Sequence, residues 1–149
     1  MLRCLLDPPW SIAIEDEAPL AIVAVTRGQA WFVPTGPSDD PPDAPVRLEP
    51  GDVAIIRGPD HYIVADDPRS APDIVIDPGE VCRTPDGAPL AEPMDLGVRT
   101  WGNSPTGATA LLVGTYLSEG EVSRVLLDAL PPAVIVRDGD WDPGVRDLL

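Results

Sequence analysis

The stretch RLEPGDVAIIRGPDHYIVAD, residues 47–66, alternates short β-prone runs with two turns and carries the only histidine of the chain. The first turn, Pro-Gly-Asp at 50–52, and the second, at 57–60, are built from residues that favour tight turns. Valine, isoleucine and tyrosine are enriched in strands, so the runs between the turns predict strands at 53–56 and 62–64. The stretch therefore predicts strand, turn, strand, turn, strand, with His61 where the last strand begins.

The rest of the chain repeats this alternation. It holds 20 prolines and 13 glycines, yet 44% of its 149 residues are hydrophobic, which is too many for a disordered chain. Many short strands joined by tight turns account for both numbers. Strands are expected at 10–14, 20–26, 30–33, 46–48, 53–56, 62–64, 74–76, 96–100, 110–116 and 133–136, and a polar loop at 34–45. The expected fold class is mainly β, with one hydrophobic core.

Helical signals replace strand signals near residue 118. Ser118 and Glu121 have the spacing of a capping box, and Pro131 stops the helix that they begin. The apolar face of this helix is expected to pack on the β-strands of its own chain. A second helix is expected to start at Asp142. It is too short to be stable alone, so we expect it to be cut from a longer protein and to pair between chains.

The resulting dimer interface is expected within residues of roughly 120 to 149. The residues expected there are Val122, Val125, Leu126, Val145, Leu148 and Leu149.

Net charge, the length of apolar runs and the spacing of the cysteines limit the partners, the location and the thiol state expected for this chain. The chain carries 10 Lys and Arg against 25 Asp and Glu, a net charge of −15 at pH 7, and therefore repels nucleic acid and anionic membranes. It has neither a membrane-spanning run of about 20 apolar residues nor a secretory signal, so a cytoplasmic location is expected. Cys4 and Cys82 are far apart and form no CxxC pattern, so reduced thiols are expected.

The opening stretch resembles the second conserved motif of cupin barrels, in which a Gly-Asp turn, an apolar strand and a Pro/Gly turn deliver a histidine into the barrel mouth. The matching positions are Gly51, Asp52, Gly58 and His61, with the turn one residue shorter than usual. Together with AVTRGQAWFV (24–33) and ALLVGTYLSEGEVSRVLLDALPPAVIV (110–136), the stretch is similar to the N-terminal cupin sensor domain of bacterial AraC-type transcription regulators.

This resemblance implies a fold and a function. Residues 1–117 would form a cupin-like β-barrel, a double-stranded β-helix or jelly roll, that binds a small-molecule effector. Residues 118–149 would form one or two short helices that pair two protomers and link the barrel to a DNA-binding domain absent from this chain. DNA would be contacted only through that domain, and the chain itself would not be an enzyme.

The sequence departs from metal-binding cupins. Their first motif carries two histidines and a glutamate, whereas this chain has one histidine in all and places Ala21 about where the glutamate should be. No metal and no other cofactor is therefore expected. A carboxylate-rich site that combines His61 with Glu15 or Glu17 is the alternative.

Candidate ligand-binding residues come from the barrel rim and from the aromatic side chains. We expect His61 to be the remnant of a metal position, kept for ligand contact or for structure. Trp31 and Phe32 are neighbours in one strand, so one points inward and the other outward. Arg83 beside Cys82 would lower the pKa of that thiol, although a structural thiol at a strand end is the expected role. The candidate ligand-binding residues are His61, Trp31, Tyr62 and Trp10.

Two alternatives to a sensor domain remain open. No motif for nucleophilic catalysis or phosphate binding is present, but a stand-alone cupin enzyme, such as a small isomerase or oxygenase, has the same barrel. A stand-alone cupin binding protein is the other alternative.

Overall fold

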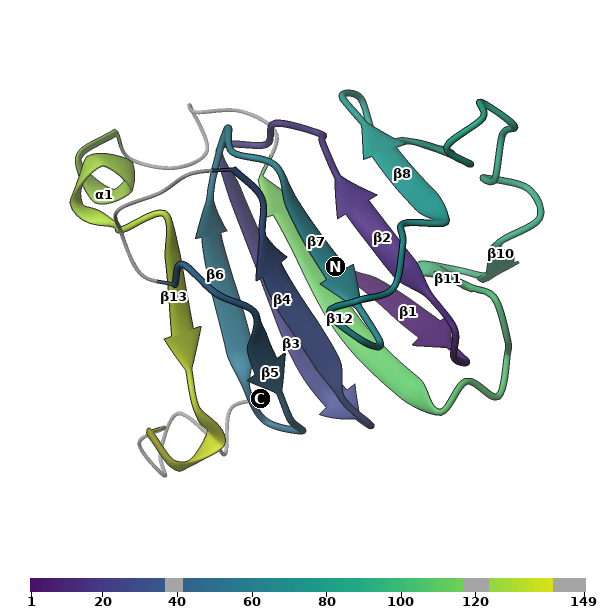
Figure 1. Ribbon diagram of the computed structural model, residues 1–149, viewed down its shortest axis with the longest axis horizontal. Coiled ribbons are helices and arrows are strands. Elements are labelled where there is room, and N and C mark those ends of the chain that lie inside the picture. The colour runs from purple at the N-terminus through teal and green to yellow at the C-terminus, as the bar shows by residue number, and fades with distance from the viewer. Residues whose placement is uncertain (37–41, 117–123, 141–149) are drawn as a thin grey trace.

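The computed structural model describes residues 1–36, 42–116 and 124–140. Within these ranges the chain forms thirteen β-strands arranged in two sheets, with a short α-helix and a 3₁₀-helix near the C-terminal end (Figure 1). The mainly β fold class predicted from the sequence is confirmed. In this described part of the chain, no helix has the length and the apolar character needed to cross a membrane.

The first sheet has seven strands, in the order β10-β11-β1-β12-β3-β6-β13. They are β10 (Asp95–Gly97), β11 (Thr100–Gly102), β1 (Leu2–Leu6), β12 (Thr109–Tyr116), β3 (Leu20–Arg27), β6 (Val53–Arg57) and β13 (Ala133–Val136). The second sheet has six strands, in the order β5-β4-β7-β2-β8-β9. They are β5 (Val46–Leu48), β4 (Ala30–Pro34), β7 (Tyr62–Ala65), β2 (Ser11–Ile14), β8 (Ile74–Asp77) and β9 (Val81–Arg83). The strand expected at 133–136 thus joins the larger sheet beside β6.

The two turns of the opening stretch bracket β6 and depend on glycine. Gly51 has a φ of 93°, a conformation that glycine adopts without steric cost. Gly58 lies so close to the neighbouring chain that an added Cβ would stand 1.8 Å from the carbonyl oxygen of Ala18. The two glycines therefore allow the chain to turn tightly into β6 and to leave it against the segment that leads into β3.

The sequence pattern does not predict β1 or β9, and the structure divides the strand expected at 96–100. Val98 is 91% exposed and lies in a turn where Arg99 has a φ of 48°. The segments on either side, β10 and β11, pair with each other in antiparallel fashion. The prediction of one strand at 96–100 is wrong, because the chain reverses direction inside that segment.

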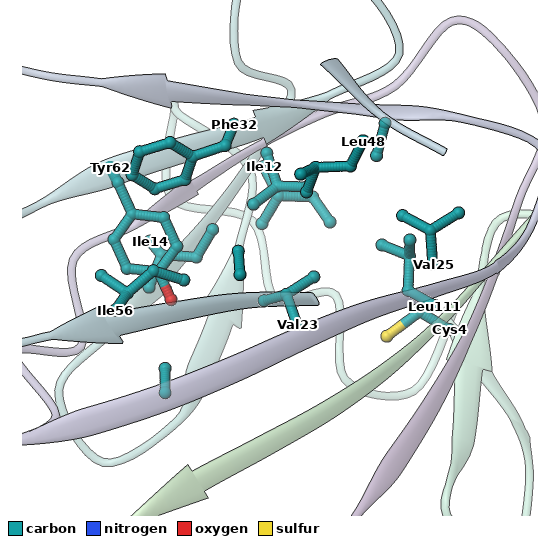
Figure 2. Packing of buried hydrophobic residues seen from close by; sticks show 14 of the residues in the cluster. Cys4, Ile12, Ile14, Val23, Val25, Phe32, Leu48, Ile56, Tyr62 and Leu111 are labelled. Atoms are coloured by element: carbon teal, nitrogen blue, oxygen red, sulfur yellow. The ribbon is translucent and has the colours of Figure 1, made fainter. Parts of the chain in front are cut away.

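The hydrophobic core lies between the sheets and takes side chains from both (Figure 2). Phe32 is 3% exposed and its ring centroid lies 5.6 Å from that of Tyr62, whereas Trp31 is only half-buried. The predicted alternation of these two neighbours in one strand is confirmed. The largest fully buried side chains are Trp10, Leu6, Leu48, Leu111 and Val25.

The helix α1 (Arg124–Ala129) buries a different residue from those predicted. Leu127 is 5% exposed and packs against Leu20, whereas Val125 and Leu126 are 79% and 51% exposed. Arg57 holds the helix end in this orientation, since its Nη1 donates to the carbonyl oxygen of Leu130 at 2.5 Å. The prediction that Val125 and Leu126 pack on their own barrel is wrong, because Leu127 occupies that side of the helix.

The remaining predictions for the C-terminal segment fall on positions that the structure does not describe. Val122 of the first helix belongs to this group, as does the whole second helix with Val145, Leu148 and Leu149.

Candidate ligand-binding cavity

A cavity of about 420 Å³ lies between the two sheets. Its size is in the range of small-molecule binding sites, which is about 300–1,000 Å³. The larger sheet contributes residues of β1, β3, β11 and β12, and the smaller sheet contributes residues of β2, β7, β8 and β9. Most of the walls are apolar, and they include Ile12, Ile14, Val23, Trp101, Leu111 and Val113.

The register of the strands shows how deep in the cavity each lining residue lies. β1 and β12 are antiparallel, with Cys4 opposite Leu111, so the start of β1 and the end of β12 lie at the same level. β1 leads through a short turn into β2, so the end of β2 returns to the level at which β1 began. Asp16 follows β2 at this level and is half-buried, whereas Cys4 and Leu111 are buried deeper along the strands. The cavity therefore has an apolar inner part and a polar open end.

Three charged side chains, Asp16, Glu80 and Arg99, line the open end. Glu80 lies between β8 and β9, and Arg99 lies in the turn before β11, where its carbonyl oxygen accepts the backbone N–H of Arg3 at 2.8 Å. Glu80 and Arg99 are exposed, and only Asp16 is half-buried. Of these three charged side chains, the one most withdrawn from solvent is therefore a carboxylate.

Tyr62 forms one wall of the cavity. Its side chain is 6% exposed, and its ring packs beside that of Phe32 (Figure 2). Burial raises the pKa of the Tyr62 hydroxyl, and the nearby carboxylate of Asp16 raises it further. The hydroxyl forms no hydrogen bond with the described part of the chain. It is thus a neutral polar group available to a ligand at the level of Asp16.

All four sulfur-containing residues of the chain, namely both cysteines and both methionines, line this one cavity. Burial raises the pKa of the Cys4 thiol to about 12, and electrostatic repulsion from Cys82 adds to the effect. Burial also raises the pKa of Cys82. The alternative in which Arg83 lowers the pKa of Cys82 is contradicted, since burial raises that pKa and the Arg83 guanidinium pairs with Asp77 at 2.5 Å.

The four candidate ligand-binding residues from the sequence lie in different places. Tyr62 lines the cavity, whereas Trp10 is buried in the core away from it and Trp31 lies half-buried outside it. His61 is exposed and borders a separate hollow of about 40 Å³ that Tyr62 also lines. The structure thus places Tyr62 between the cavity and the hollow beside His61.

Several cavity residues carry no signal in the local sequence. Asp16, Met94 and Trp101 come from a loop, from the segment before β10 and from β11. The cavity depends on pairing between segments about 100 residues apart, as between β1 and β12, and such pairing leaves no local signal.

His61 lies between two carboxylates but does not form a metal site with them. Its Nδ1 is 3.9 Å from Glu15, and its Nε2 is 3.8 Å from Glu17. The two ring nitrogens face opposite sides of the imidazole, so the two carboxylates cannot converge with one nitrogen on a single ion. Among the described residues, no group of three or more His, Cys, Asp or Glu side chains is arranged to hold a metal ion. The donors present therefore do not fit the metal centre of metal-binding cupins.

Comparison with known proteins gives one match. Residues 1–149 match a family model described as cupin. No curated protein and no solved structure matches the chain.

Proposed function

The chain belongs to the cupin family, and on that premise we propose that it is the ligand-sensing and dimerisation domain of a cytoplasmic AraC-type bacterial transcription regulator, without catalytic activity of its own. A small-molecule effector binds in the cavity and controls a helix-turn-helix domain attached beyond Leu149. The observation that carries the proposal is the cavity of about 420 Å³, with apolar walls inside and polar groups at its open end. Such a cavity has the character of small-molecule binding sites.

The path from the cavity to the C-terminal segment is short. β12 lines the cavity through Leu111, Val113 and Thr115 and leads directly into the segment before α1. α1 in turn packs on the same sheet through Leu127, which contacts Leu20 of β3, the neighbour of β12. A ligand that favours one position of β12 can therefore shift the helix, provided that it binds the two arrangements with different affinity.

The exposed face of α1 supports the dimerisation part of the proposal. Val125 and Leu126 of α1 expose their apolar side chains to solvent, while Leu127 of the same helix packs on the larger sheet. A second protomer that covered them would gain about 1.5–3 kcal/mol for each fully buried side chain.

Binding to duplex DNA tests this proposal. Residues 1–149, with their net charge of −15, are expected not to retard duplex DNA even at low salt, whereas the proposed regulator that includes the helix-turn-helix domain is expected to do so. A reading frame that stops at Leu149, or an extended protein without DNA binding, contradicts the regulatory function and favours a stand-alone cupin binding protein. Turnover of a small substrate by the purified chain would instead favour a cupin enzyme.

A further inference from the structure

Two features of the cavity lining together indicate which chemistry its ligand has. Its inner part holds the sulfur atoms of Cys4 and Met94 and the indole ring of Trp101, and its open end holds a half-buried carboxylate. We propose that the cavity binds an aromatic amine, with the ring against Cys4, Met94 and Trp101 and the ammonium group beside Asp16. This inference rests on the proposed function in one respect only, namely that both require a small molecule in the cavity.

The sulfur atoms favour a ring as the body of the ligand. The chain has two cysteines and two methionines, and all four line the cavity although they come from β1, β9 and two other segments. Sulfur is polarisable and makes favourable contacts with aromatic rings, each worth about 0.3–1.5 kcal/mol. Trp101 adds an aromatic face that a second ring can meet edge-on or offset.

The two thiols are suited to packing rather than to reaction. The raised pKa values of Cys4 and Cys82 keep both sulfurs protonated at neutral pH. A protonated thiol in apolar surroundings is a poor nucleophile and behaves as a small hydrophobic group. The inner part of the cavity therefore favours a non-covalent ligand.

The charges at the open end favour a cation. Glu80 and Arg99 are both exposed and opposite in sign, so their effects on a ligand largely cancel and are screened by salt. Asp16 is less exposed, accepts only the backbone N–H of Ala18 at 3.2 Å, and forms no ion pair with the described residues. A carboxylate that is partly removed from water gains most from a charged hydrogen-bond donor. The neutral hydroxyl of Tyr62, near Asp16, can accept a second N–H of the same ammonium group.

A matched series of probes tests both parts of the inference by calorimetry. 4-Phenylbutylamine, 4-phenylbutanol and 4-phenylbutanoate share one ring and differ at the end group, whereas 4-cyclohexylbutylamine keeps the amine and replaces the aromatic ring. A charge-assisted hydrogen bond is worth about 1.5–3 kcal/mol, so the aromatic amine is expected to bind about tenfold or more tightly than the alcohol and the carboxylate. It is also expected to bind more tightly than its cyclohexyl analogue.

Two variants assign the preference to Asp16. Asp16→Asn keeps an oxygen that can accept the Ala18 amide but loses the charge, so the tenfold preference for the amine is expected to disappear. Glu92→Gln is the control, because it removes a charge from the segment that borders the cavity without lining it, and it is expected to keep the preference. Bound amine is also expected to slow the labelling of Cys82 by iodoacetamide, which places the probe inside the cavity.

Several outcomes overturn the inference. They are tighter binding of 4-phenylbutanoate, equal binding of 4-cyclohexylbutylamine, an amine preference that persists in Asp16→Asn, and no binding of any probe at millimolar concentration. These outcomes concern the ligand class alone. The proposed function is judged separately, by the DNA binding of the extended protein, which does not depend on the probes.

Discussion

Arg137 donates from Nη1 to Oδ2 of Asp52 across 2.9 Å, and the amide of Asp138 donates to Oδ1 of the same carboxylate at 2.9 Å. Asp52 is the acid of the Gly-Asp turn before β6, and Arg137 follows β13. Since β6 and β13 are neighbours in one sheet, this ion pair joins the motif that identifies the barrel to the strand after α1. It thereby holds the C-terminal segment against the barrel.

Loss of the Asp52 charge is expected to destabilise the protein. In Asp52→Asn the buried acceptor of Arg137 and of two backbone amides becomes neutral. Hydrogen bonds to charged groups contribute about 1.5–3 kcal/mol, and we expect a loss of that order in the free energy of unfolding, measured by urea denaturation. Glu49→Gln is the control: its exposed carboxylate lies 3.5 Å from Arg47 and is expected to contribute less than about 1 kcal/mol. Equal effects of the two changes would contradict this account.

The contribution of Asp52 is expected to depend on pH. Burial alone would raise its pKa, but the amides and the Arg137 guanidinium outweigh burial and hold the pKa below the ordinary value of 3.8. A carboxyl group with a lowered folded-state pKa stabilises the protein above its ordinary pKa, and this stability is lost as the pH falls through the folded-state pKa. The difference in unfolding free energy between wild type and Asp52→Asn should therefore be constant from pH 7 to 5 and shrink below pH 4. A difference that grows on acidification would show that another group is responsible.

The two thiols are expected to react at different rates. Cys4 is 1% exposed and has a pKa of about 12, so at pH 8 only about one Cys4 thiol in ten thousand is ionised. Cys82 is only half-buried. Peptide mapping after treatment with iodoacetamide should therefore find Cys82 labelled first and Cys4 labelled only in urea. In Cys82→Ser the folded protein should stay unlabelled, and rapid labelling of Cys4 in either protein would mean that the inner part of the cavity is open to solvent.

A dimer in solution is expected from the C-terminal segment. We expect the wild type to sediment as a dimer, and the double changes Val125→Glu with Leu126→Glu, or Leu148→Glu with Leu149→Glu, to shift it to monomer. Each covered Leu or Val side chain contributes about 1.5–3 kcal/mol to the association, and a buried charge opposes it.

Val98→Glu is the control for the dimer experiment, since Val98 is 91% exposed in the turn between β10 and β11. It should leave the dimer intact. A wild-type monomer, or a dimer indifferent to all four glutamates, would remove residues 120–149 from the interface.

Purified protein is expected to hold no stoichiometric transition metal. Ala21, at the position where metal-binding cupins have a glutamate, is 5% exposed and offers no donor, and the two carboxylates near His61 face opposite nitrogens of its ring. Elemental analysis after purification without chelator is the measurement. About one iron, manganese or zinc per chain would show that His61 and its neighbours rearrange around an ion.

The strands that the sequence predicts correctly are those with local signals. β6 and β7 follow turns marked by glycine and proline and are rich in β-branched and aromatic residues. β1, by contrast, reads LRCLL with no turn before it, and leucine does not favour strands as valine and isoleucine do. Its partners are β11 and β12, about 100 residues away. β1 forms a strand because it pairs with these distant segments. The pattern of neighbouring residues in the sequence carries no information about such pairing.

The β class, the turn before β6 and the resemblance to cupins could be predicted from the amino-acid sequence, because each rests on residues that are close together in the chain. The place of the candidate ligand-binding cavity emerged only from the folded structure. Of the four candidate residues from the sequence, it placed Tyr62 in the cavity and left Trp10, Trp31 and His61 outside it. It brought together instead Cys4, Asp16, Cys82, Met94 and Trp101. The cavity is the space enclosed by two facing sheets, so its lining follows from the order and register of strands that are far apart in the sequence.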